Sequence, residues 1–121
     1  MSEIEPLLGP GLVGGVYRPV WAGDPDAAAR LREAGWSVAE VPEVVSLHDF
    51  YVEVAHALEL PDYFGANLDA LWDCLTDLIG PTALLWPGWA ELAVSRADQW
   101  GRLMPVLAAR TRQQPAFALV L

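Results

Sequence analysis

The chain has 121 residues, the size of one domain, and its apolar fraction of 54% excludes a disordered chain. Its formal net charge is −9, from 16 acidic residues against 7 basic ones, and every basic residue is arginine. Such a charge repels nucleic acids and anionic membranes and attracts cationic partners, so direct binding of nucleic acid is disfavoured. The charge is also uneven, because the stretch from Glu33 to Val94 carries 11 acidic residues and no arginine.

Cysteine usage and the N-terminal residues bear on the compartment. Cys74 is the single cysteine, so no internal disulfide can form and a reducing compartment is the simpler interpretation. The N-terminus lacks the basic region and the long apolar run of a signal peptide, and no apolar run reaches the ~20 residues of a membrane span. We therefore expect a soluble cytoplasmic protein without a membrane partner.

Glycine, proline and helix-capping residues divide the chain into elements. Residues 1–14 are rich in glycine and proline and are expected to be a flexible segment, followed by a single domain over residues 15–121. The patterns predict, in chain order, a strand over Gly15–Trp21, a helix capped by Asp24 that runs from Pro25 to Glu33, a strand over Trp36–Val41, a helix from Ser46 that stops before Pro61, a helix over Leu68–Ile79, a strand over Thr82–Trp86, a short helix over Trp89–Val94, a helix within Ala97–Gln113 and a strand over Phe117–Leu121.

The order of these elements predicts an α/β fold. Strands that are separated by helices pair in parallel through right-handed crossovers, which gives a small parallel sheet covered by helices. Pro19 would remove one hydrogen-bond donor from the first strand and places that strand at an edge. The continuous apolar run Thr82–Trp86 is typical of a strand buried on both faces, and Gly35 is expected to end the first helix.

One formal motif match carries no function in this interpretation. Residues 9–14 fit the pattern G-x-G-x-x-G, which binds dinucleotides only between a strand and a helix. Here only eight residues precede the motif and a strand-like run follows it. We interpret the match as chance and expect no cofactor.

The predicted helix over Leu68–Ile79, for which Asn67 is the expected N-cap, has two contrasting faces. Its core face is expected to hold Leu68, Leu71, Leu75, Leu78 and Ile79. The opposite face carries Asp69, Asp73, Thr76 and Asp77, with Trp72 at the border. Like charges at i, i+4 spacing cost a few tenths of a kcal/mol per pair, and the helix contains no basic residue to relieve them. A solvated acidic face remains one explanation; the nearby aromatic residues favour a binding surface.

The segment from Leu60 to Thr76, Leu-Pro-Asp-Tyr-Phe-Gly-Ala-Asn-Leu-Asp-Ala-Leu-Trp-Asp-Cys-Leu-Thr, resembles the signature of the barstar family of intracellular ribonuclease inhibitors. A weaker similarity extends from about Trp36 to Leu121, so residues 15–35 would be an added strand–helix unit beside three family strands. The resemblance implies an inhibitor without catalysis, cofactor or metal. It also implies a partner, a small secreted guanyl-specific ribonuclease whose active site receives an acidic helix and its preceding loop in place of RNA phosphates.

The resemblance also assigns roles to individual residues. Asp73 matches the principal carboxylate of the family, Asp69 a second one, and Tyr63 the aromatic residue that packs on the enzyme's catalytic histidine. Gly65 would let the backbone approach the partner closely. The expected partner-binding residues are Tyr63, Phe64, Gly65, Asn67, Asp69, Trp72, Asp73, Thr76 and Asp77.

The last helix departs from the family pattern. The family prototype meets its enzyme with a glutamate there, whereas the stretch Leu107–Arg112 contains no acid, and Arg110 and Arg112 could repel a basic target. An immunity or interaction protein of the same fold, directed at a different basic toxin or protein, is therefore the alternative hypothesis.

Other chemistry is disfavoured. Asp69 and Asp73 would lie about 6 Å apart on one helix face with equal exposure, which gives a glycosidase no means of separating their pKa values. Glu53-x-x-His56 is half of a di-iron motif whose other half is missing. His48 and His56 are expected on helix surfaces. Asp73 should raise the pKa of the neighbouring Cys74 thiol, which argues against a reactive cysteine.

Overall fold

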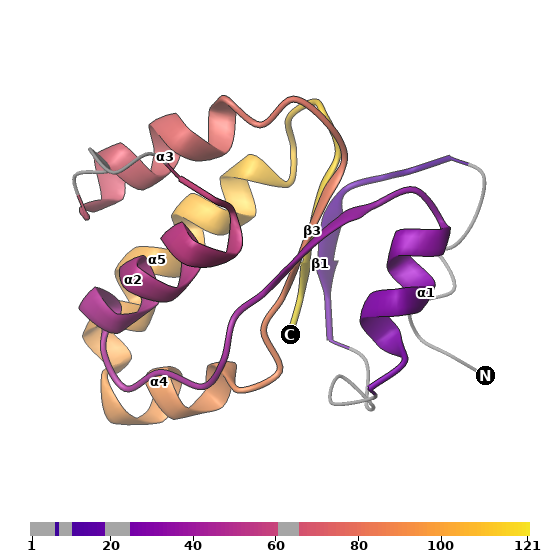
Figure 1. The fold of residues 1–121 in the computed structure, drawn as a ribbon. Helices are drawn as coiled ribbons and strands as arrows, with labels where there is room; N and C mark the ends of the chain where they lie inside the picture. Colours follow the sequence, from indigo (N-terminus) through magenta and orange to yellow (C-terminus); the bar gives the residue numbers. More distant parts are fainter. Residues whose placement is uncertain (1–6, 8–10, 19–24, 61–65) are drawn as a thin grey trace.

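The computed structural model describes residue 7 and residues 11–18, 25–60 and 66–121 of the chain (Figure 1). Its elements are β1 (Gly15–Tyr17), α1 (Ala27–Glu33), β2 (Ser37–Glu40), α2 (Leu47–Ala57), α3 (Leu68–Thr76), β3 (Thr82–Leu85), α4 (Trp89–Ser95), α5 (Ala97–Arg110) and β4 (Phe117–Val120). Each predicted helix and strand is present, with ends that differ by a few residues. Among the described residues, no helix is long and apolar enough to cross a bilayer.

The four strands form one parallel sheet in the order β1-β4-β3-β2. This confirms the predicted α/β class and the edge position of β1, whereas Pro19 and Trp21 lie outside the described residues. The central strands β3 and β4 are buried along their whole length, because helices cover both faces of the sheet there. Their continuous apolar sequences follow from that position.

Helices α2, α3, α4 and α5 lie on one face of the sheet, and α1 lies on the other (Figure 1). The larger core fills the first face and includes Phe50, Trp86 and Leu107, all fully buried. The second core lies under α1 and includes Leu31 and Trp36. Leu7 belongs to this second core: its side chain is buried, and its carbonyl oxygen accepts a hydrogen bond from the Trp36 indole N–H at 2.8 Å.

Helix α1 starts later than predicted and ends as predicted. It begins at Ala27, with Asp26 at the N-cap position but without a side-chain capping bond, so the expected start at Pro25 is wrong; Asp24 lies outside the described residues. Gly35 has φ 107°, and the Trp36 N–H donates to the Leu31 oxygen at 3.1 Å. This is the left-handed closure for which glycine was expected.

Helix α2 closes in the same way without a glycine. Ser46 caps its start by accepting the Asp49 N–H at 3.1 Å, as predicted. At its end, Glu59 has φ 53° and the Leu60 N–H donates to the Ala55 oxygen at 2.8 Å. The sequence patterns attributed this end to Pro61, which lies outside the described residues. Within the described residues, α2 thus closes through the left-handed backbone of Glu59.

Gly14 explains part of the G-x-G-x-x-G match. The residues that follow it form β1, so the helix that a dinucleotide site requires is absent at that place. A Cβ atom on Gly14 would lie 2.6 Å from the Phe117 carbonyl oxygen. The glycine is therefore needed where the chain passes closely over the start of β4.

Candidate functional site

The start of α3 is fixed by Asn67. This residue has an extended backbone at φ −144°, and its side-chain oxygen accepts the Ala70 N–H at 2.8 Å. It is therefore the N-cap that the sequence predicted. Ala66, directly before it, has φ 49°, a conformation that a non-glycine residue rarely adopts.

The end of α3 differs from the prediction. The helix stops at Thr76 with Asp77 at the C-cap position, three residues before the expected end at Ile79. The backbone must extend before Pro81 in order to enter β3, which disfavours helical geometry there. Because the helical periodicity ends early, Ile79 is fully exposed rather than on the core face, and Leu78 is only partly buried.

The two faces of α3 are otherwise as expected. Leu71 and Leu75 are fully buried, Leu68 is half-buried, and Trp72 lies half-buried at the border. The polar face is exposed and carries Asp69, Asp73, Thr76 and Asp77. The Thr76 hydroxyl donates to the main-chain carbonyl oxygen of Asp73 at 2.9 Å, not to the Asp73 carboxylate. Tyr63, Phe64 and Gly65, the expected aromatic and glycine contacts, lie outside the described residues.

Asp69, Asp73 and Asp77 form the acidic row of α3, and little in the described residues offsets its negative charge. The ion pair between Arg32 and Glu40, at 3.6 Å, lies away from α3. Asp69 lies in the first helical turn, where the helix dipole favours a negative charge. Asp73 and Asp77 lie toward the C-terminal end, where the dipole opposes them. A cationic group placed against this face would offset the negative charge of both residues.

Arg110 holds the C-terminal end of α3 from within the core. The side chain is fully buried, its Nε–H donates to the Leu75 carbonyl oxygen at 2.7 Å, and one terminal nitrogen donates to the Gln113 oxygen at 3.2 Å. Burial lowers the pKa of this guanidinium from its usual value. Its positive charge meets the negative end of the α3 dipole, so it anchors the helix that carries the acidic row.

The buried position of Arg110 corrects one expectation. Arg110 does not reach the surface and so cannot repel a basic target; of the two arginines considered, only Arg112 is exposed. The signal was present in the sequence, because Leu103, Leu107 and Arg110 follow the i, i+4, i+7 spacing of one helix face. An arginine on a core face is unusual, and this one is accommodated by the Leu75 carbonyl group at the end of α3, by the Gln113 carbonyl group and by the ring of Phe117.

Cys74 lies half-buried on α3. Burial raises the pKa of its thiol, and the carboxylates of Asp77 and Asp73 raise it further. The predicted direction is confirmed, although burial contributes more than the Asp73 charge from which it was predicted. A protonated thiol is a poor nucleophile.

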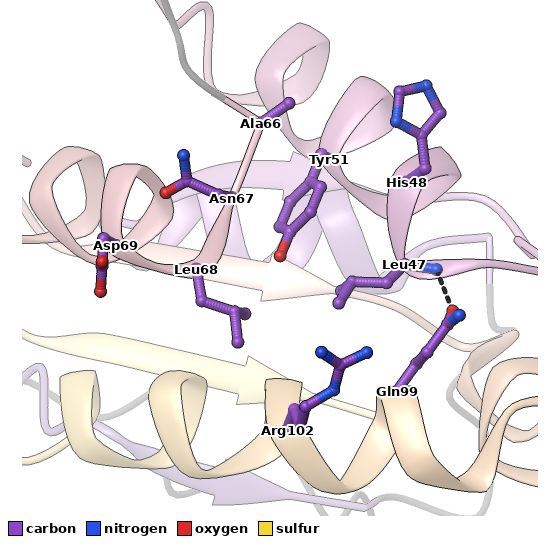
Figure 2. A pocket seen from close by; sticks show the side chains of 9 residues that line it. All are labelled: Leu47, His48, Tyr51, Ala66, Asn67, Leu68, Asp69, Gln99 and Arg102. Carbon is purple, nitrogen blue, oxygen red and sulfur yellow. Dashed lines mark hydrogen bonds between the residues drawn. The ribbon is translucent and has the colours of Figure 1, made fainter.

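A groove adjoins the start of α3, and the sequence patterns did not indicate it (Figure 2). Its walls come from the first turns of α2, α3 and α5, and its volume is about 740 Å³. Asn67 and Asp69 lie on one side of it, and Arg102 reaches in from α5 (Figure 2). Its lining residues are far apart in the sequence, so no local pattern could show it. We call it the α2–α3–α5 groove.

Metal ligands are not gathered in the described part of the chain. No group of three or more histidine, cysteine, aspartate or glutamate side chains there could hold a metal ion. His48 and His56 are both exposed on α2, as expected of helix-surface residues.

Comparison with known proteins places the chain in a family. The family model described as Barstar (barnase inhibitor) matches residues 37–121, the region from β2 to the end of the chain, and leaves β1 and α1 outside. A protein of Bacillus subtilis (strain 168) named "Putative ribonuclease inhibitor YrdF" is 43% identical over 49 residues. That alignment covers 40% of this chain and 38% of the relative's length. With the fold and the position of the acidic helix, the match over residues 37–121 shows that this chain belongs to the barstar family.

Proposed function

We propose that the chain is an intracellular inhibitor of a small secreted guanyl-specific ribonuclease, similar to barnase. The observation that carries the proposal is the exposed acidic row on α3, held between a side-chain cap at Asn67 and a buried anchor at Arg110. Membership of the barstar family supports it. The name of the Bacillus subtilis relative agrees with it.

The mechanism is occlusion of an active site by phosphate mimicry. A ribonuclease holds the RNA backbone with cationic side chains, and a carboxylate can form charge-assisted hydrogen bonds with the same groups. Asp69, Asp73 and Asp77 are four residues apart, so they advance by about 6 Å per step along the helix axis. Asp73 would enter the phosphate-binding position and Asp69 a neighbouring one. No bond is made or broken by the inhibitor, and no cofactor takes part.

Rigidity explains why a helix suits this task. Carboxylates fixed on a capped and anchored helix lose less conformational freedom on binding than carboxylates on a loop. The net charge of −9 adds long-range attraction to a basic enzyme, which speeds encounter and weakens as salt is added. The remaining contacts of the proposed surface are Tyr63, Phe64, Gly65, Asn67, Trp72, Thr76 and Asp77.

Steady-state kinetics test the proposed mode of action. The purified chain is titrated against guanyl-specific ribonucleases with an RNA substrate at several concentrations. Occupation of the phosphate site predicts competitive inhibition, with a raised apparent KM, an unchanged kcat and weaker inhibition at higher salt. Absence of inhibition across these enzymes, or inhibition that lowers kcat alone, contradicts the proposal.

A different basic toxin or protein is the alternative target. The surface of α5 favours this alternative, because it presents Arg102 to the groove and the stretch Leu107–Arg112 contains no acid. A pull-down from the source organism with the wild-type chain and with Asp73→Asn as the bait separates the two hypotheses. A captured ribonuclease supports the first, and a captured basic protein of another class supports the second.

A further inference from the structure

Arg102 gives the α2–α3–α5 groove a positive centre beside the acidic row. In Figure 2 its guanidinium points from α5 into the groove, toward Leu47 and the hydroxyl end of Tyr51. Asp69 lies at the other end of the same groove. The surface next to α3 therefore carries charges of both signs, although the chain as a whole is strongly acidic.

Arg102 is exposed and has no internal counter-ion in the described residues. None of the carboxylates described by the structure lies within ion-pair distance of it, whereas the exposed Arg32 on α1 pairs with Glu40. An arginine that lines a groove without such a partner keeps its planar set of N–H donors available for an incoming group.

The walls of the groove are held by hydrogen bonds between side chains and the backbone. The Leu47 N–H, at the start of α2, donates to the Gln99 side-chain oxygen of α5 at 2.8 Å, and this bond is drawn in Figure 2. Asn67 caps the start of α3 on the opposite wall. Leu47 and Leu68 supply apolar surface between these polar groups. The groove is thus shaped before a partner arrives, which lowers the entropy lost on docking.

We propose that the groove receives an aspartate or glutamate side chain of the target protein, which pairs with Arg102 while cationic groups of the same target meet Asp69 and Asp73. The inference rests on the proposed inhibitor function and adds the chemistry of the target surface. A carboxylate matches the guanidinium because two parallel N–H···O bonds can form between them. A cationic side chain would meet repulsion at Arg102.

This pairing makes Arg102 a specificity-determining residue. The acidic row alone attracts any basic cleft, whereas Arg102 penalises a target that presents only cations along the α5 side. The preferred target has a basic cleft bordered by an acidic residue. The contact from the last helix therefore has the opposite sign to the glutamate contact that the family resemblance implied.

The test compares two charge reversals of equal size. Binding of an inactivated guanyl-specific ribonuclease, chosen because the wild-type chain inhibits its active form, is measured for Arg102→Glu and for Arg32→Glu. Arg32 is exposed on α1, on the other face of the sheet (Figure 1). Both variants become more acidic by two charges, so general attraction to a basic enzyme strengthens equally in both.

The proposal predicts opposite signs. Arg102→Glu should weaken binding by about tenfold or more, while Arg32→Glu should leave it unchanged or strengthen it. Lysine substitution of one acidic residue bordering the enzyme's cleft should restore binding to Arg102→Glu. The inference is overturned if Arg102→Glu binds more tightly than the wild-type chain, or if none of these lysine substitutions in the enzyme restores binding. Either result is compatible with the proposed inhibitor function. Failure of the wild-type chain to bind any such ribonuclease overturns both.

Discussion

Arg110→Ala tests whether a buried arginine holds the end of the acidic helix. The change removes the 2.7 Å hydrogen bond to the Leu75 oxygen and leaves that carbonyl unpaired at the end of α3, at a cost of about 1–3 kcal/mol. It also removes two buried methylene groups, Cγ and Cδ, worth about 1.6 kcal/mol. The substitution also removes a buried charge, and one terminal nitrogen of Arg110 has no hydrogen-bond partner among the described residues. Removal of this charge offsets part of the loss. The expected net destabilisation is about 2–4 kcal/mol.

Urea denaturation followed by tryptophan fluorescence measures this loss as a lower midpoint at an unchanged slope. Arg110→Met keeps most of the side-chain volume and should cost less than half as much. Arg112→Ala removes an exposed arginine two residues away and should change the free energy of unfolding by less than about 0.5 kcal/mol. If Arg110→Ala were as stable as Arg112→Ala, the anchoring role of Arg110 would be refuted.

Three further predictions follow from single residues. Glu59→Gly should raise the free energy of unfolding by about 0.5–1 kcal/mol because Glu59 has φ 53°, and a thermal melt that shows no gain would contradict this explanation. Burial raises the pKa of the Tyr51 phenol, so above about pH 10 the unfolded chain loses this proton before the folded chain does. The free energy of unfolding should therefore fall as the pH rises through the folded-state pKa. Urea melts from about pH 8 to pH 11 should show a smaller fall for Tyr51→Phe than for the wild-type chain. Cys74 should react with iodoacetamide at pH 8 more slowly than the cysteine of an unstructured peptide, and Asp77→Asn should speed the reaction; equal rates for the protein and the peptide would show that the thiol pKa is not raised.

Local sequence signals predicted the fold class and the ends of several elements. Glycine at position 35 and asparagine at position 67 act through their own backbone and side chain, so the sequence alone was sufficient to place them. The continuous apolar run of β3 predicted its burial on both faces. These predictions needed no knowledge of which elements lie side by side.

The features that the sequence did not reveal depend on neighbours that are distant along the chain. Glu59 adopts a conformation that favours glycine, so no residue preference indicated the left-handed closure of α2. The helical spacing places Arg110 on a core face, but the Leu75 carbonyl group that accepts its hydrogen bond lies 35 residues away. Ile79 is exposed because α3 ends early. The α2–α3–α5 groove exists only where three helices meet. Such features are set by tertiary packing rather than by local pattern.

The central claim is tested most directly by the affinity of Asp73→Asn for a guanyl-specific ribonuclease that the wild-type chain inhibits. The matched control is Glu33→Gln, which removes one charge from an exposed residue on α1, on the far face of the sheet (Figure 1). If Asp73 occupies the phosphate site, its substitution should weaken binding by about 30-fold or more, equivalent to about 2 kcal/mol, while the control changes it by less than about twofold. Equal, small effects of the two substitutions would contradict the claim that α3 carboxylates replace RNA phosphates in the active site.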